Sequence, residues 1–197
     1  MTRGEKILFI IAGSFGAYYL YNYFVRTRLI ISDTSNTTDQ PLFNMSNYTS
    51  PDYRGQASLP LGLQNNNPGN IRYVASIPWQ GQVGSNQGFA VFSDLQHGIR
   101  AFVINASNLI KQDGTLQAYL NQYAPSGENN TTAYIDYVSA ATGIQPTDAV
   151  SLDHDTLKGL AKAQFEMENG TSAADQYISD ADLEAGLSLT PYSNIIS

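Results

Sequence analysis

The chain has 197 residues, which suits one domain of ordinary size with an additional segment. Its formal net charge is -7, and the surplus of acid falls on residues 60–197, which carry thirteen Asp and Glu against five Lys and Arg. Such a domain lacks the positive surface that phosphate backbones require, which argues against nucleic acid as a partner. Cysteine is absent and only two histidines occur, so disulfides and Cys nucleophiles are excluded, and we expect no metal site and no cofactor.

An uncharged apolar run extends from Ile7 to Val25. At about 1.5 Å per residue it is long enough to cross a hydrocarbon core of about 30 Å. Tyrosines crowd its C-terminal end, and Arg26 and Arg28 follow. We therefore predict that residues 1–28 form a single transmembrane anchor that places residues 7–25 in a lipid membrane. A cleavable signal peptide and a buried soluble helix are the alternatives.

Residues 29–60 are rich in Ser, Thr, Asn, Asp and Pro without sustained periodicity, which predicts a flexible stalk. From about residue 61 the sequence shows turn motifs and apolar residues at helical spacing, so we assign residues 61–197 to one folded domain. The positively charged residues on the two sides of the apolar run balance, so the membrane orientation is not predicted, and the oligomeric state is not indicated either.

The folded domain is predicted to be mainly α, with short extended segments. Turn residues fill positions 65–70, and extended pieces are expected at Ile71–Val74 and Phe89–Phe92. Apolar residues at helical spacing then predict three helices: one after an Asp94 cap, one over residues 116–123, and one after a Thr131 cap. Residues 171–197 suggest a short acidic helix and an irregular tail.

A fourth helix is predicted from about Asp153 to Glu168. Its apolar stripe contains Leu157, and continuing the stripe by eleven residues reaches Glu168, about 20° away at about 100° per residue. Glu166 is predicted to point to the opposite side. Asn169 and Gly170 suit the end of the helix.

Glu168 is the leading candidate for a catalytic acid. A carboxyl group on an apolar face is desolvated, desolvation favours its protonated form, and a protonated carboxyl group can donate a proton to a leaving glycosidic oxygen. Two structural alternatives remain: Glu168 is a frayed residue of the last turn, or it is paired with Arg72 or Arg100.

Three stretches carry a resemblance to a known family. They are QNNNPGNIRYVASIPWQGQVGSNQGFAVFSDLQHGIRA, YAPSGENNTTAYIDYV and LAKAQFEMENG, which together span roughly residues 62–170. They resemble a family of phage and bacterial lysozyme-like proteins that includes virion-associated lytic enzymes. This resemblance implies a mainly α, α+β lysozyme-like fold that acts on the glycan strands of peptidoglycan.

A looser similarity connects the chain with bacterial glucosaminidases, in which a helix ending in Glu-x-Gly carries the catalytic Glu. The stretch from Ala163 to Gly170 resembles that helix, which implies that Glu168 is the acid. The stretch Asn70 to Arg72 resembles the strand that lines the substrate. The Glu helix comes last here rather than first, and a circular permutation would reconcile the two orders.

Other residues are candidates for a site on the same domain. Glu128 is the rival acid, but it lies in a loop that enters a helix, where the helix dipole favours the charged carboxylate, so we expect it to orient substrate or to have a structural role. Aromatic faces stack on sugar rings, and Trp79, Tyr73 and Tyr123 are candidates for this contact. Trp79 is equally consistent with a core anchor, and Asp94 with a helix cap.

We therefore expect a lytic transglycosylase that cleaves the MurNAc–GlcNAc β-1,4 bond, because a single Glu suffices when the C6 hydroxyl of the substrate is the nucleophile. A muramidase or glucosaminidase would need a second carboxylate. A structural or wall-binding virion protein without activity is the alternative from another class. With the anchor, the resemblance suggests the internal membrane of a tailless phage virion, and otherwise a bacterial inner membrane.

Overall fold

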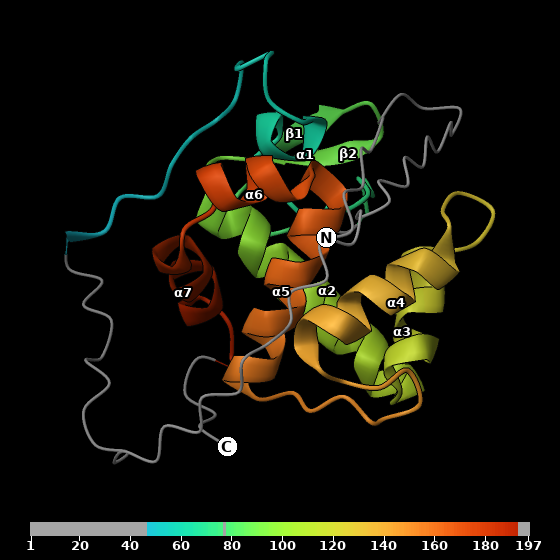
Figure 1. The fold of residues 1–197 in the computed structure, drawn as a ribbon. Helices are drawn as coiled ribbons and strands as arrows, with labels where there is room; N and C mark the ends of the chain where they lie inside the picture. The colour runs from blue at the N-terminus through green and yellow to red at the C-terminus, as the bar shows by residue number, and fades with distance from the viewer. Residues whose placement is uncertain (1–46, 77, 193–197) are drawn as a thin grey trace, which may run out of the picture.

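The computed structural model describes residues 47–76 and 78–192. Over this range the prediction of a mainly helical domain is confirmed, with seven helices and two short strands (Figure 1). In chain order the elements are α1 (Leu61–Gln64), β1 (Gln82–Asn86), β2 (Phe89–Phe92), α2 (Leu95–Asp113), α3 (Leu116–Tyr123), α4 (Thr131–Thr142), α5 (His154–Asn169), α6 (Thr171–Tyr177) and α7 (Asp180–Ser188).

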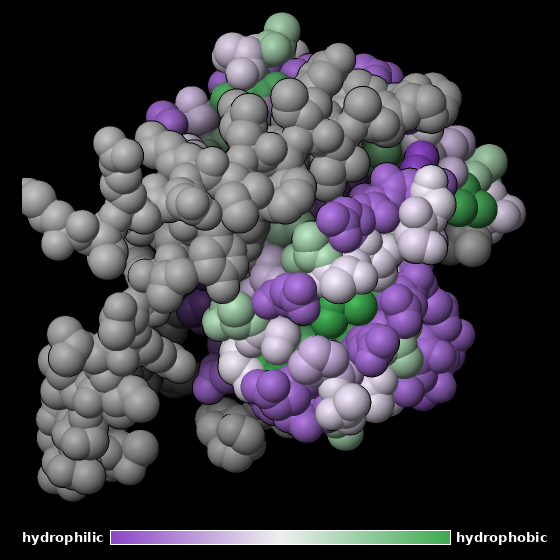
Figure 2. All heavy atoms as spheres, turned by 45° about the vertical axis from the view of Figure 1, so that its right-hand side comes forward, coloured by the Kyte–Doolittle hydropathy of each residue, from purple (hydrophilic) through white to green (hydrophobic). Residues whose placement is uncertain are grey.

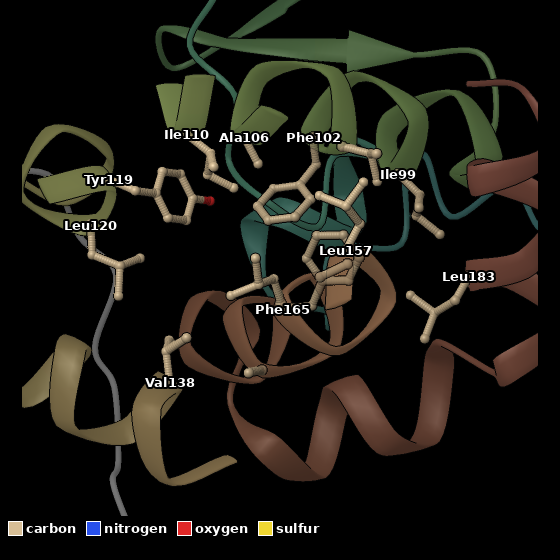
Figure 3. Close-up of a cluster of buried hydrophobic side chains, with 14 of the residues drawn as sticks. Ile99, Phe102, Ala106, Ile110, Tyr119, Leu120, Val138, Leu157, Phe165 and Leu183 are labelled. Carbon is tan, nitrogen blue, oxygen red and sulfur yellow. The ribbon is translucent and has the colours of Figure 1, made fainter. Parts of the chain in front are cut away.

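The core forms around α2 and α5, the two longest helices. Helix α7 packs against α2 on one side, and α3 and α4 cover the other side (Figure 1). Phe102 of α2 and Phe165 of α5 meet edge to face with ring centroids 4.8 Å apart, and both rings are buried. Leu157 of α5 lies in the same cluster, as Figure 3 shows. The apolar stripes predicted on both helices therefore face each other, and their burial is the main source of stability.

The helix ends follow local chemistry. The Asp94 and Asp153 side chains each accept a hydrogen bond from a backbone N–H three residues ahead. The predicted Asp94 cap is therefore confirmed, and Asp153, predicted only as the start of its helix, is the cap of α5. Helix α4 is capped by Asn130, and the predicted Thr131 cap is wrong. The Thr131 hydroxyl instead donates to the carbonyl oxygen of Ala124 at 2.6 Å, which ties the first turn of α4 to the end of α3.

Strands β1 and β2 form an antiparallel hairpin. The strand predicted at Phe89–Phe92 is confirmed as β2. The extended piece predicted at Ile71–Val74 is reduced to one bridge between Arg72 and Phe89. This bridge places residues 71–73 along β2, on the side opposite β1.

The segment before α1 contacts the helical body. The Tyr48 hydroxyl donates to Asp182 of α7 at 2.6 Å, and the Tyr53 hydroxyl donates to the carbonyl oxygen of Tyr177 at 2.8 Å. The packed body therefore extends back to at least Tyr48, into the range that the sequence assigns to the stalk.

The predicted anchor at residues 7–25 lies outside the described residues. Among the helices that the structure describes, none is long and apolar enough to cross a membrane. Where the face shown in Figure 2 is coloured, it is mostly hydrophilic with small scattered apolar areas.

Candidate active site

The site is built on the asparagine-rich loop that precedes residue 71. Asn65, Asn66 and Asn67 are buried although they are polar. Buried amide groups are tolerated when they are hydrogen-bonded, and the side chains of Asn66 and Asn67 bond the backbone around them, whereas the Asn65 oxygen accepts from the Asn86 amide at 2.9 Å. Asn67 donates to the carbonyl oxygens of Ile71 and Ala90, both at 2.9 Å, and accepts from the Ile71 N–H at 2.9 Å. The loop is thus fixed to strand β2 by asparagine side chains, a role that their suitability for turns does not predict.

Two glycines allow the loop to approach the helices closely. A Cβ atom on Gly98 of α2 would lie 1.8 Å from the carbonyl oxygen of Asn66, so only glycine fits there. A Cβ atom on Gly69 would lie 2.5 Å from the ring of Phe102. The Tyr123 hydroxyl at the end of α3 donates to the carbonyl oxygen of Gly69. The loop is therefore held between α2 and α3.

The C-terminal end of α5 completes the attachment. The amide of Asn169, the last residue of α5, donates to the carbonyl oxygen of Pro68 at 2.7 Å and to that of Phe165 at 3.0 Å. Gly170 follows with φ of 81°, a conformation that favours glycine and turns the chain out of the helix. Helix α5 therefore ends at the loop.

Glu168 lies at this junction and is half-buried. Its Oε2 accepts a hydrogen bond from the Asn70 amide at 2.7 Å, and its Oε1 accepts one from the Tyr134 hydroxyl of α4 at 3.1 Å. Asn70 has φ of 48°, in the left-handed region that asparagine tolerates, and this conformation is part of what places its amide on α5. Glu168 is therefore fixed from two sides rather than frayed.

The protonation of Tyr134 is consistent with its role as a donor. Burial, followed by the negative charge of Glu168, raises the pKa of Tyr134 well above its ordinary value. The Tyr134 hydroxyl therefore stays protonated at physiological pH and acts as the hydrogen-bond donor to Glu168. The neighbouring ring of Tyr123 lies 6.2 Å from that of Tyr134, between centroids, which gives the carboxyl group an aromatic surrounding.

The predicted contrast between Glu168 and Glu166 is too strong. Glu166 is also half-buried, and it accepts a hydrogen bond from the Tyr137 hydroxyl of α4. The apolar stripe of α5 is buried as predicted, but α4 packs along α5 and a tyrosine of α4 donates a hydrogen bond to each glutamate, which the periodicity of α5 alone does not reveal.

Glu128 and Arg72 form an ion pair next to this site. Their side chains are 59% and 57% exposed, respectively, and Glu128 belongs to the loop between α3 and α4. The guanidinium carbon of Arg72 also lies 4.8 Å from the centre of the Phe89 ring. Since Asn70 contacts Glu168 and Arg72 contacts Glu128, the structure brings both candidate acids to the same three-residue segment.

The remaining candidates are distributed around the hairpin. Trp79 is partly buried and packs against Ala90, Phe92 and Ala101, which favours its role as a core anchor. Tyr73 is 39% exposed, and its backbone N–H donates to Gly88 in the hairpin turn at 2.9 Å. Both residues therefore contact the sheet, whereas Asn70 and Tyr123 contact the Glu168 junction.

The sequence did not identify Tyr134 as a site residue. It lies in the helix predicted after residue 131, and its contact with Glu168 joins residues 34 positions apart. Arg100, considered as a partner of Glu168, donates to the carbonyl oxygen of Leu189 at 3.1 Å. Over residues 47–76 and 78–192, no group of three or more His, Cys, Asp or Glu side chains is arranged to hold a metal ion.

The fold and site define a small, mainly helical domain with a half-buried glutamate at the end of a central helix. No protein-family model matches the chain. The chain is 31% identical over 117 residues to "Protein P5" of Pseudoalteromonas phage PM2, and the match covers 56% of this chain and 72% of the relative. The chain therefore belongs to the same protein family as this bacteriophage protein.

Proposed function

We propose that this protein is a membrane-anchored lytic transglycosylase with a lysozyme-like domain, that it cleaves the MurNAc–GlcNAc β-1,4 bond of peptidoglycan, and that Glu168 is its catalytic acid. The observation that carries the proposal is the placement of Glu168. Its carboxyl group is half-buried at the end of a helix and is held at both oxygens by Asn70 and Tyr134. Catalytic groups must be held in this way, because small displacements are costly to the reaction rate.

The hydrogen bonds hold both oxygens of Glu168: Oε2 accepts from the Asn70 amide and Oε1 accepts from the Tyr134 hydroxyl. In the proposed reaction a protonated Glu168 donates its proton to the glycosidic oxygen as the bond to C1 breaks. The resulting carboxylate then takes the proton of the MurNAc C6 hydroxyl, which attacks C1 and yields a 1,6-anhydro product.

A peptidoglycan hydrolase is the second candidate, and one observation favours it. Glu128 contacts the same segment as Glu168 through Arg72, so a second carboxylate stands near the first. Inverting glycosidases need a second carboxylate to activate water, about 6.5–9.5 Å from the acid. The Glu128 carboxylate is already paired with Arg72, whereas Glu168 is held by neutral donors at both oxygens, and this supports the single-acid transglycosylase.

Membership of a phage protein family and the apolar run at residues 7–25 support the proposed setting. In that setting the protein is part of a virion with an internal membrane and opens the host wall locally during genome delivery or release. A bacterial inner membrane is the other location. Membrane flotation of purified virions and of host envelopes distinguishes the two locations by showing which membrane fraction carries the protein.

A zymogram with purified peptidoglycan tests the proposal. The full-length chain should clear the gel, and Glu168→Gln should abolish clearing. Glu166→Gln is the matched control, since Glu166 lies on the same helix and also accepts a hydrogen bond from a tyrosine of α4. An inert parent would support a structural or wall-binding virion protein, whereas clearing by Glu168→Gln would remove Glu168 from the reaction.

A further inference from the structure

The exposed ion pair between Arg72 and Glu128 is the strongest feature that the proposed function does not use. Both side chains are more than half exposed, and each belongs to a different loop. Exposed ion pairs contribute little to the stability of a fold. Arg72 follows Asn70, the residue that contacts Glu168, by two positions, so the pair is a candidate for a role at this site rather than in stability.

Arg72 is held in place independently of Glu128. Its backbone forms a bridge with Phe89, and its guanidinium group lies over the ring of the same residue. Stacking on an aromatic face orients the planar fork of an arginine and leaves its edge N–H groups free to bind a carboxylate. If Glu128 moved away, Arg72 would remain presented toward solvent beside the catalytic carboxyl group.

A substrate with negative charge would need a local positive group such as Arg72 for binding, because the domain carries a net negative charge. Residues 60–197 carry thirteen acidic against five basic side chains, so the domain as a whole repels anions. Arg72 follows Asn70 by two residues, so its backbone lies at most about 7 Å from that of the residue that contacts Glu168. A negatively charged group on the sugar next to the scissile bond would reach it.

We propose that Arg72 is a specificity-determining residue that binds a carboxylate carried by the muramyl unit of the substrate, and that Glu128 occupies this place until the substrate displaces it. This inference rests on the proposed function, because it assumes that glycan strands bind at Glu168. Two sources supply the carboxylate: the lactyl group of a MurNAc without peptide, and the stem peptide of an intact strand.

Binding of three glycan probes by the full-length chain, purified in detergent, tests the inference. The probes are chitooligosaccharides without carboxylates, amidase-treated strands with free lactyl groups, and strands with stem peptides. The parent should bind one or both carboxylated probes about fivefold more tightly than the chitooligosaccharide, which is the effect of one exposed charge pair. The carboxylated probe with the lower Kd identifies the source.

Variants separate this role from a structural one. Arg72→Gln should abolish the preference for carboxylated strands and leave the Kd for chitooligosaccharides unchanged, and Glu128→Gln should strengthen binding of carboxylated strands alone. Arg54→Gln is the control, because Arg54 forms a comparably exposed pair with Asp52 at 2.6 Å, away from Glu168. It should keep the parent's preference.

The outcomes that overturn the inference differ from those that overturn the proposed function. If Arg72→Gln keeps the preference, or loses affinity for all three probes equally, Arg72 does not select for a carboxylate. A parent that clears peptidoglycan without any preference among the probes overturns this inference alone. A parent that neither clears peptidoglycan nor binds any probe overturns both.

Discussion

Substituting Gly98 by alanine should destabilise the domain by distorting the loop that carries Asn70. The new Cβ would lie 1.8 Å from the carbonyl oxygen of Asn66, so that oxygen must retreat by about 1.6 Å to reach an ordinary contact of 3.4 Å. The side chain of Asn66 donates to the carbonyl oxygen of Phe92 at 3.1 Å and accepts from the Tyr53 N–H at 2.8 Å, so the loop cannot move without straining both bonds.

Gly159 of α5 is the matched control for this substitution. An added Cβ there would meet only the Cγ2 atom of Thr142, at 4.0 Å, which is an ordinary contact. Replacing a glycine by alanine inside a helix stabilises it by about 0.5–1 kcal/mol. Gly159→Ala should therefore raise the free energy of unfolding by that amount.

Overpacking costs about 1–3 kcal/mol, so Gly98→Ala should have a lower free energy of unfolding than the parent. The helical gain applies to both variants, because both glycines lie inside helices, so the two variants should differ by about 1–3 kcal/mol. Urea unfolding followed by circular dichroism measures both values, and unchanged slopes would show that only stability has changed. If Gly98→Ala unfolds at the same urea concentration as the parent, the close approach of α2 to the loop is refuted.

Two further predictions concern hydrogen-bonded groups. Tyr134→Phe removes the donor to Oε1 of Glu168, so it should lower the free energy of unfolding by about 1–2 kcal/mol and slow peptidoglycan clearing, measured by urea unfolding and by turbidity. For His154, burial opposes protonation, but hydrogen bonds and charges from Asp155 and Glu184 outweigh it and raise its pKa above the ordinary 6.5. Its contribution to stability is therefore complete below about pH 6.5 and is lost as the pH rises through the raised pKa, so His154→Gln should flatten that part of the pH profile of urea unfolding.

Each of these predictions has a control. Tyr137→Phe removes the corresponding contact with Glu166, so it should affect stability but not clearing. Equal loss of clearing in Tyr134→Phe and Tyr137→Phe would mean that the α4 tyrosines act only through the fold. A pH profile that is the same with and without His154 would show that its ion pairs do not contribute to folding.

Helices α2 to α5 could be predicted from the sequence because their signals are local, whereas α1 was not predicted and one short helix was predicted where α6 and α7 lie. Helices α2 and α5 each combine an apolar stripe with an aspartate cap, and both signals lie within a few residues of each other. Strand β1 could not be predicted, since Gly84, Ser85 and Asn86 have low strand propensity and the strand exists only through its pairing with β2.

The site was predicted in part for the same reason. The register of α5 predicted Glu168 next to the apolar stripe, where it is half-buried, but its partners Asn70 and Tyr134 lie 98 and 34 residues away in the chain. No periodicity connects such positions, so only the packing of α4 and the loop against α5 could identify them. The ion pair of Arg72 with Glu128 spans 56 residues and was missed on the same grounds.

The central claim, that Glu168 drives transglycosylation, is tested most directly by mass spectrometry of the fragments released from purified peptidoglycan. The account predicts that the full-length parent releases fragments with 1,6-anhydro-MurNAc ends and that Glu168→Gln releases none. Fragments with hydrated reducing ends, or equal release by Glu168→Gln and the parent, would contradict it.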